Sequence, residues 1–354
     1  MIIAPLAIVA MTACDIPTSA PNWETRWIVR AEDTTIPVSS FLPGQVTEVD
    51  AATFRISVSG GGIARSLGEL CSACAVFNGM VAPKPAFSTT LQSEVAFPVD
   101  LDSLVLTGGT IRVRVVNNLG FDPIRPAAAP GAARGQIVIT IRNAGTVLGV
   151  HTLDGAATSF TPGTSRIESV VFDPAGLPRK IGGTVAFEVM ITSPAGDPVA
   201  INTAESITVE AADAAVDANA AIVRVTDRTV SADPMTLDLS GLEADLTDRV
   251  RRGALLLDID NPFSIGGTLT ATLTAPGVTL VRPLEVIPGT SQARLSFTGD
   301  ELRSLFGPAP VSLAVSGPLS GVPAGRVTVR PAQQLTAAGR LELFLATNGS
   351  ENGQ

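Results

Sequence analysis

Thr268-Leu-Thr-Ala-Thr-Leu-Thr274 is an uninterrupted stretch in which apolar or small side chains alternate with threonine. Successive side chains of a β-strand point to opposite faces, so this pattern predicts a strand with one buried and one wet face. Residues 136–142, 184–191 and 311–316 show the same alternation, and turn signals such as Ala275-Pro-Gly277 separate the strands. Short alternating strands at this spacing predict antiparallel sheets packed as a sandwich.

Four short matches then occur in the same order in the two halves of the chain. They pair residues 97–104 with 235–242, 112–121 with 255–263, 162–165 with 288–291, and 199–206 with 327–334. Collinear matches of this kind predict a duplicated module. We place the first copy at 86–212 and the second at 222–348, with an Ala- and Asp-rich linker over 213–221 between them.

The predicted fold is therefore all-β, with tandem immunoglobulin-like antiparallel β-sandwiches that follow an N-terminal β-rich region over 23–85. Two short helices are expected in the second copy. Ser240-Gly-Leu-Glu243 and Thr298-Gly-Asp-Glu301 are both capping boxes, in which the first and fourth residues satisfy each other's backbone N–H groups. The first helix would carry Leu242, Leu246 and Val250 on its apolar side and end at Gly253.

The turn sequences of the two copies carry a family resemblance. Asn117-Asn118-Leu-Gly-Phe121 and Asp260-Asn261-Pro262-Phe263 each follow an expected strand. They resemble the Asn-Pro signature of LEA14-type and water-stress/hypersensitive-response domains, although Leu119 stands where proline is expected. The resemblance implies an immunoglobulin-like or fibronectin-like sandwich that binds or shields rather than catalyses. Locally, Asn and Pro would end the strand, and Phe121 or Phe263 would anchor the turn to the core.

The N-terminal residues have the pattern of a bacterial lipoprotein signal. An apolar run over residues 1–13 leads into Met11-Thr-Ala-Cys14, which is typical of a lipobox, although no Lys or Arg precedes the run. The run is shorter than the roughly 20 apolar residues that span a bilayer. Cleavage would make Cys14 the N-terminus and attach lipid to its sulfur. An ordinary signal peptide and a buried N-terminal strand are the alternatives.

Residues 14–22 would then be a lipidated tether and residues 349–354 a polar tail. The expected location is the bacterial cell envelope, on the outer or inner membrane, facing the periplasm or the surface. Asp15 after the lipidated cysteine leaves the choice of membrane open.

Composition excludes one class of partner. The chain has 354 residues and a formal net charge of −9. A phosphate backbone would be repelled, so no nucleic-acid partner is expected. Aromatic residues make up only 4%, and Tyr is absent, so the core must be aliphatic.

Cys71 and Cys74 remain as a pair once Cys14 is assigned to lipid. In an oxidising compartment they can form a disulfide that closes a very short loop. A redox pair and half of a zinc site are the other interpretations. Thioredoxin-like redox sites start a helix in an α/β fold, and a zinc site needs four ligands. The sequence favours a structural disulfide and indicates no metal and no cofactor.

Catalytic constellations are scarce. The single histidine, His151, is expected on a strand surface, and no GxSxG, HExxH or Walker A motif is present. Asp100 with Asp102 and Asp258 with Asp260 are carboxylate pairs that could perturb each other's pKa. Together with Asp213 and Asp217, these acids could bind Ca²⁺ between domains, but no EF-hand spacing supports that reading.

The sequence thus predicts a non-enzymatic, lipid-anchored envelope protein. Its sandwiches would present loops or sheet edges to an envelope protein, a glycan or a lipid. Two alternatives stay open. One is a carrier that holds an acyl chain or another apolar ligand between its sheets, and the other is a thiol redox protein that uses Cys71 and Cys74.

Overall fold

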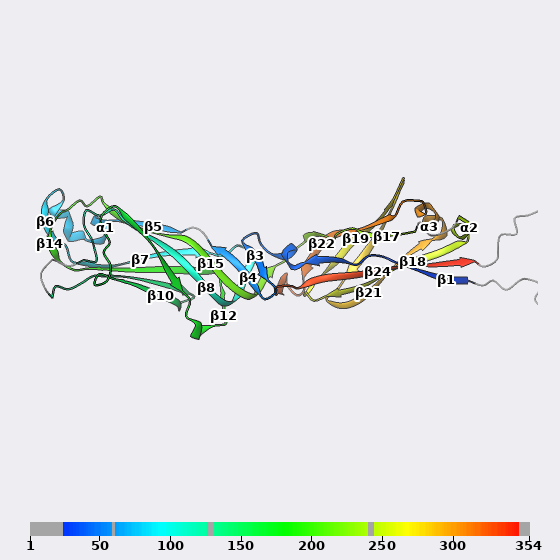
Figure 1. Ribbon diagram of the computed structural model, residues 1–354, viewed down its shortest axis with the longest axis horizontal. Coiled ribbons are helices and arrows are strands. Elements are labelled where there is room, and N and C mark those ends of the chain that lie inside the picture. Colours follow the sequence, from blue (N-terminus) through cyan, green and yellow to red (C-terminus); the bar gives the residue numbers. More distant parts are fainter. Residues whose placement is uncertain (1–23, 59–60, 126–130, 240–243, 347–354) are drawn as a thin grey trace, which may run out of the picture.

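A computed structural model describes residues 24–58, 61–125, 131–239 and 244–346. Figure 1 shows an elongated molecule in which two antiparallel β-sandwiches lie end to end. The all-β prediction is confirmed. The signal over 1–13, the lipidated Cys14 with its tether, the capping box at 240–243 and the tail over 349–354 lie outside the described residues.

The first sandwich is built from seven main strands. They are β7 (Phe87–Ala96), β8 (Leu101–Asn117), β9 (Gln136–Asn143), β10 (Thr146–Asp154), β11 (Thr164–Val171), β13 (Thr184–Ser193) and β15 (Ser206–Arg224). One sheet has the order β10-β9-β13-β7, and the other contains β11-β8-β15. The second sheet is extended by β3 (Val46–Asp50), β4 (Thr53–Val58), β5 (Gly62–Ser66) and β12 (Arg179–Gly182).

The second sandwich repeats this arrangement. Its strands are β16 (Arg228–Ser231), β17 (Met235–Leu237), β18 (Val250–Asn261), β19 (Ile265–Ala275), β20 (Val278–Val286), β21 (Gly289–Thr298), β22 (Val311–Gly321) and β24 (Gln334–Ala346). One sheet has the order β16-β22-β19-β20, with β17 also on β22, and the other contains β21-β18-β24. Strand for strand, the sheet order is that of the first sandwich, as a duplicated module would have.

The strand order can be compared with that of an immunoglobulin domain, which places strands A, B, E and D on one sheet and C, F and G on the other. Both sandwiches here keep the central pairs, the second strand with the fifth and the third with the sixth. The first, fourth and seventh strands lie on the opposite sheet from their immunoglobulin counterparts. The arrangement is therefore a related sandwich with its outer strands exchanged.

The alternating stretches form strands because alternation lets each strand bury one face. Buried and less buried residues alternate along β13, and β19 buries Leu269, Ala271 and Leu273 while its threonines point outward. The core between the sheets is mostly Val, Ile and Leu. This follows from the low aromatic content.

The predicted linker over 213–221 is wrong, because this segment lies inside β15. The 19-residue strand pairs with β8 along most of its length and also with β4, β5 and β23 (Arg326–Val329). Val216, Ala218 and Ala221 are buried. Ala218, Ala220 and Ala221 are small side chains packed in the core, and the backbone groups pair with neighbouring strands.

The predicted N-terminal region over 23–85 is likewise not a separate unit. Its first strands, β1 (Glu24–Arg30) and β2 (Thr34–Pro37), pair with β24 of the second sandwich, whereas β3, β4 and β5 belong to the first. The remainder forms a cap of α1 (Leu67–Leu70), the 3₁₀ helix η2 (Ser72–Phe77) and β6 (Val81–Lys84), which pairs with β14 (Gly196–Ala200). A further 3₁₀ turn, η3 (Pro174–Gly176), precedes β12.

The two helices expected in the second copy have different outcomes. Helix α3 (Gly299–Leu305) begins at the predicted capping box between Thr298 and Glu301. The other ends earlier than predicted, since α2 (Ala244–Thr247) stops before Val250, where β18 begins. Gly253 does not close a helix but lies in β18, where a Cβ would stand 2.5 Å from the Glu342 carbonyl oxygen.

The chain passes between the two sandwiches four times: from β2 to β3, from β15 to β16, from β22 to β23 and from β23 to β24. The first passage contains the 3₁₀ helix η1 (Val38–Phe41). Phe41 packs on Phe263 of the second sandwich with ring centroids 5.1 Å apart. The Gly321 N–H of β22 donates to the carbonyl oxygen of Val225, the residue after β15, at 2.8 Å. The sandwiches are therefore joined by a packed junction.

Candidate functional site

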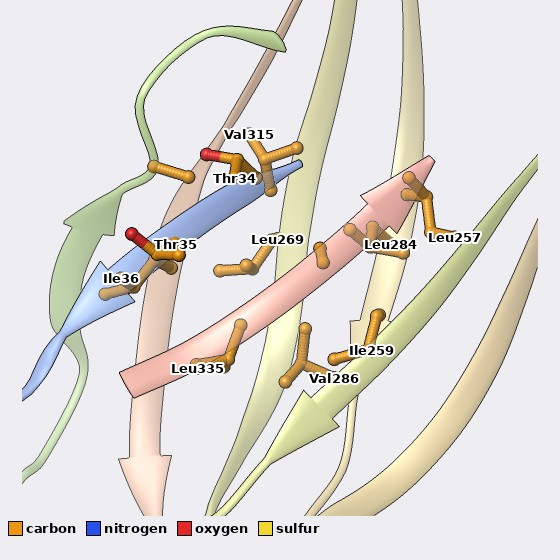
Figure 2. Close-up of a pocket in the computed structure, with 12 residues that line it drawn as sticks. Thr34, Thr35, Ile36, Leu257, Ile259, Leu269, Leu284, Val286, Val315 and Leu335 are labelled. Carbon is orange, nitrogen blue, oxygen red and sulfur yellow. The ribbon is translucent and has the colours of Figure 1, made fainter. Parts of the chain in front are cut away.

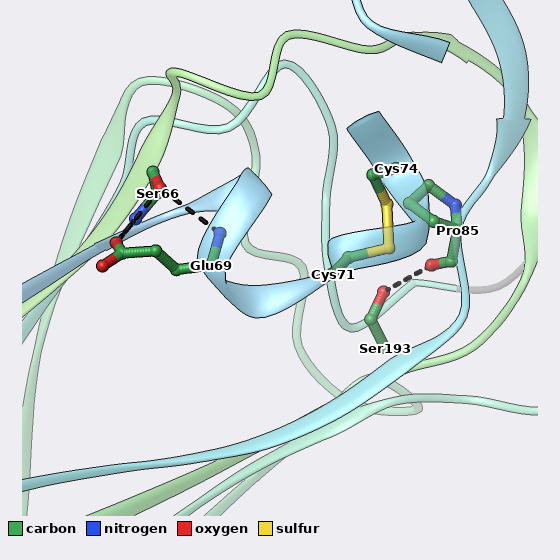
Figure 3. The surroundings of a disulfide bond; sticks show 6 residues. All are labelled: Ser66, Glu69, Cys71, Cys74, Pro85 and Ser193. Carbon is green, nitrogen blue, oxygen red and sulfur yellow. Dashed lines mark hydrogen bonds between the residues drawn. A yellow bond between two sulfur atoms is a disulfide. The ribbon is translucent and has the colours of Figure 1, made fainter. Parts of the chain in front are cut away.

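The cap at the end of the first sandwich contains the predicted disulfide. Cys71 and Cys74 are bonded, and both residues are buried, with 8% and 2% of their surfaces exposed. Cys71 ends α1 and precedes η2. Beside the disulfide, Ser193 donates a hydrogen bond to the carbonyl of Pro85 (Figure 3). The bond thus ties two short helical turns that have little core of their own.

A capping box that the sequence analysis did not identify starts the cap. Ser66 Oγ accepts a hydrogen bond from the Glu69 N–H, and Glu69 Oε2 accepts one from the Ser66 N–H (Figure 3). The bond from the Ser66 N–H, first, and a second bond that the Ser66 hydroxyl donates to Glu69 Oε2 lower the pKa of Glu69. Ser66-Leu-Gly-Glu69 has the S-x-x-E pattern, so the helix start was readable from the sequence.

Lys84 fixes the other side of the cap, and its role was not predicted. Only 4% of the residue is exposed. Its Nζ donates to the carbonyl oxygens of Asp122 at 3.0 Å and Pro123 at 3.4 Å, and also to that of Arg125. A buried ammonium is tolerated only when its donors are satisfied. Lys84 therefore holds the loop after β8 against β6.

Burial lowers the pKa of Lys84 from 10.5 to about 8, against the opposing effect of the Asp122 carboxylate. We expect the Lys84 signal to titrate near that value in NMR spectra of protein labelled only at lysine. Lys180, exposed in β12, gives the only other lysine signal, and Lys84→Met assigns the two. A protein in which neither lysine titrates below about pH 9 would contradict this expectation.

The sign of the linked stability effect follows from the lowered pKa. Between about 8 and 10.5 the unfolded chain holds the Lys84 proton while the folded chain has released it. This contribution to stability therefore grows as the pH rises through that window and is lost as the pH falls to 8. In Lys84→Met the contribution should be missing from the pH profile of urea unfolding.

The cap also exposes apolar side chains. Four large ones lie within six positions: Val76 is 72% exposed, Phe77 45%, Met80 50% and Val81 74%. A depression of about 310 Å³ adjoins them, lined by the disulfide, Phe77, Pro83 and Ile201 among others. Residues 72–83 contain no charged side chain, a signal that the sequence offered and that went unused.

The turn residues of the two copies are brought to equivalent places, with one correction. Asn117 and Asn261 are both buried, and each makes the same three hydrogen bonds. The side-chain oxygen accepts from the N–H two residues on, and the amide donates to two carbonyls (Leu119, Phe121 and Phe160 in the first copy; Phe263, Ile265 and Ile287 in the second).

The correct equivalence is therefore Asn117 with Asn261, which is one residue away from the sequence alignment. Asn118 matches Pro262, and both are exposed. Leu119 corresponds to Phe263, while Phe121, also buried, corresponds to Ile265. Asp260 precedes the turn as an exposed strand residue. The side-chain polar atoms of Asn117 and Asn261 are all bonded to backbone groups, so these two residues have a structural role.

His151 lies at an edge of the first sandwich. Its Nε2 is 3.0 Å from Glu168 Oε2, and Glu168 is also bonded to Arg166. The pair joins β10 to β11, which belong to different sheets. Within the described residues, no serine or cysteine side chain is hydrogen-bonded to His151. The constellation of a serine hydrolase is therefore not assembled here.

One member of each carboxylate pair, Asp102 or Asp258, is bound by arginine. Asp258 binds Arg340 and accepts from Gln292 at 2.6 Å, and hydrogen bonding by Gln292 is the first cause of its lowered pKa. Asp102 faces Arg326, and Asp217 pairs with Arg55 at 3.0 Å. Within the described residues no group of three metal-ligating side chains is found. Asp100 and Asp102 both lie on or beside β8, and the side chain of Asp213 is not described.

The space between the sheets of the second sandwich tests the carrier alternative. Leu257 and Ile259 of one sheet face Leu269 and Leu284 of the other around a cavity of about 20 Å³ (Figure 2). Ligand pockets usually measure about 300–1,000 Å³. This cavity is about the size needed for one water, and its walls are apolar. An acyl chain does not fit there.

The redox alternative gains no support from the cap. A disulfide exchanges by attack of a thiolate on an accessible sulfur. Here both cysteines are buried, and the pair follows α1 rather than opening an α-helix in an α/β fold.

Among the described residues, no helix is long and apolar enough to cross a membrane.

No family model and no curated protein matches the chain. Solved structures offer distant similarities. A "putative secreted protein from Parabacteroides distasonis" is 12% identical with a TM-score of 0.37, and the match covers 92% of this chain and all of that one. Infectious bursal disease virus Gt strain gives 10% identity and a TM-score of 0.19, over 97% of this chain and 47% of that one.

Allantoicase from Saccharomyces cerevisiae also gives 10% identity, with a TM-score of 0.16, over 89% of this chain and 100% of that one. All three TM-scores are low, so no inference about function rests on them.

Proposed function

We propose that the protein is a non-catalytic, lipid-anchored component of the bacterial cell envelope that holds its cap away from the membrane. Cys14 would carry the lipid, and residues 15–22 would form the tether. The two sandwiches would act as a spacer between the membrane and the cap. The cap would be the contact surface for another envelope component.

The observation that carries this proposal is the placement of the chain ends. β1 pairs with β24 from Glu24 opposite Ala346 to Arg30 opposite Arg340, so the first and last described strands lie side by side. Figure 1 shows them at one end of the molecule, and β6, β14 and α1 at the other. A tether before residue 24 therefore attaches at the end farthest from the exposed apolar cap.

The lengths of the long strands determine how far the cap lies from the chain ends. At about 3.3 Å per residue, the 19 residues of β15 and the 13 of β24 would measure roughly 60 Å and 40 Å if fully extended. The sandwiches lie end to end, so the cap would stand on the order of 100 Å from the chain ends. A packed junction supports such a spacer because it resists bending.

The carboxylates and the histidine described above also favour a non-catalytic role. Asp217 and Asp258 are engaged in ion pairs, and His151 is hydrogen-bonded to Glu168. The one titratable side chain that lines the depression beside the cap is that of Lys84, which is buried and already bonded to three backbone carbonyls. General acid–base catalysis needs an available acid or base within hydrogen-bond reach of a substrate.

Metabolic labelling with an alkyne fatty acid in a bacterial host tests the anchor. We expect the wild-type chain to take up label and Cys14→Ser to lose it entirely. The double variant Cys71→Ser/Cys74→Ser is the matched control, since it removes two thiols and should keep the label. An unlabelled wild type, or label that persists in Cys14→Ser, would rule out lipidation at this residue.

A further inference from the structure

We infer that the cap inserts its apolar segment, defined as Val76, Phe77, Met80 and Val81, into the interface of an uncharged or zwitterionic lipid surface. This surface faces the end of the molecule opposite the tether. If the proposed lipid anchor holds the other end, the protein bridges two lipid surfaces. Only this bridging role rests on the proposed anchor.

The first support is the concentration of exposed apolar side chains. Other large exposed apolar residues are spread over both sandwiches, mostly singly or in pairs, as is normal for a soluble protein. Four exposed apolar residues within six positions of the chain are unusual. Contiguous apolar patches usually mark a contact surface. They lie on η2, the following turn and β6, the cap elements at the far end of Figure 1.

Charge selects the kind of surface. Residues 72–83 are uncharged. Of the neighbouring elements, α1 exposes Glu69, which pairs with Arg65 of β5 at 3.8 Å, and β14 exposes Asp197. The whole chain carries −9. An anionic bilayer would repel this end, and an uncharged or zwitterionic one would not. Burying side chains without desolvating any charge is what interfacial insertion requires.

Rigidity is the third support. The turn between η2 and β6 is held by the Gly79 N–H donating to the Ile201 carbonyl at 2.8 Å and by the Thr203 N–H donating to Asn78 Oδ1 at 3.0 Å. The disulfide and Lys84 fix the same segment from behind. Little conformational entropy remains to be lost when the segment is buried, which favours binding by a small patch.

The experiment uses the full chain with Cys14→Ser, so that no lipid is attached, and phosphatidylcholine vesicles. Val81→Trp places a fluorophore in the apolar segment, and Val281→Trp, at a residue 52% exposed in the second sandwich, is the control. Brominated phosphatidylcholine should quench the added emission of Val81→Trp and leave that of Val281→Trp unchanged. Equal quenching of the two would overturn the inference.

Flotation measures the strength of binding. Serine at Val76, Phe77, Met80 and Val81 together should weaken the partition coefficient more than about 10-fold, since burying even one such side chain is worth about that factor. Serine at four exposed apolar residues elsewhere (Val147, Val150, Val281 and Ile287) should change it less than about twofold. Vesicles rich in phosphatidylglycerol should bind the parent chain less well.

Three results would overturn the inference: a parent chain that does not float, equal flotation of both serine variants, or a dimer in solution that only the cap variant abolishes. The last result would assign the segment to a second copy. None of them bears on the fatty-acid label, so failure of the bridge and failure of the anchor are distinguishable. Thermal unfolding of both variants checks that these exposed substitutions leave the fold intact.

Discussion

Asn117→Ala is expected to lower the free energy of unfolding by about 3–5 kcal/mol, and Asn261→Ala by a similar amount. Each side chain satisfies one backbone N–H and two backbone carbonyls. Both residues are at most 1% exposed. A buried backbone group left without a partner costs about 1–3 kcal/mol, and water has limited access to these turns. Urea unfolding monitored by circular dichroism measures the loss.

The neighbouring asparagine is the matched control. Asn118 is exposed, so Asn118→Ala should change the stability by less than about 0.5 kcal/mol. Asn117→Asp separates hydrogen bonding from packing, because it keeps the size and the accepting oxygen but loses the NH₂ group that serves two carbonyls. It should destabilise at least as much as alanine at neutral pH. Equal effects of Asn117→Ala and Asn118→Ala would contradict the account.

These turns also show how far the sequence could lead. The four collinear matches pointed to a duplication, and both turns were identified, because a strand-ending asparagine is a local signal. The alignment was one residue off. Asn117 and Asn118 are adjacent residues of the same type. Only burial decides which of them makes the three turn hydrogen bonds. A pattern with period two has the same ambiguity, since a shift by one residue exchanges the faces of a strand.

Other features depended on contacts that are remote in sequence. β1 and β2 join a sheet with β24, more than 290 residues away, and β23 leaves its own sandwich to pair with β15. Nothing in the composition of these short strands specifies a partner. The linker prediction for the Ala-rich stretch of β15 is wrong for the same reason. Its strand conformation comes from β8 and β4 on either side rather than from propensity.

The candidate site was only partly visible. The cysteine spacing predicted the disulfide, and the uncharged run over 72–83 could have drawn attention to the cap. The role of Lys84 could not be foreseen, because it depends on three carbonyls about 40 residues further along the chain. A lone lysine is most often exposed to solvent.

Phe41→Ala is expected to lower the free energy of unfolding by about 3–5 kcal/mol and to loosen the connection between the sandwiches. The residue is 1% exposed and lies in η1, where the chain passes from the second sandwich to the first. Its ring packs at 5.1 Å, tilted by 59°, on that of Phe263. Removing it leaves a cavity at the junction and loses an aromatic pair.

The same substitution at an exposed phenylalanine separates burial from composition. Phe77→Ala, in the cap, should change the stability by less than about 1 kcal/mol, because that ring is already 45% exposed. Small-angle scattering gives the second readout. If the packed junction keeps the two sandwiches in line, Phe41→Ala should broaden the distribution of end-to-end distances and Phe77→Ala should leave it unchanged. An unaltered distribution with full destabilisation would mean that the four chain crossings, not the ring contact, hold the spacer straight.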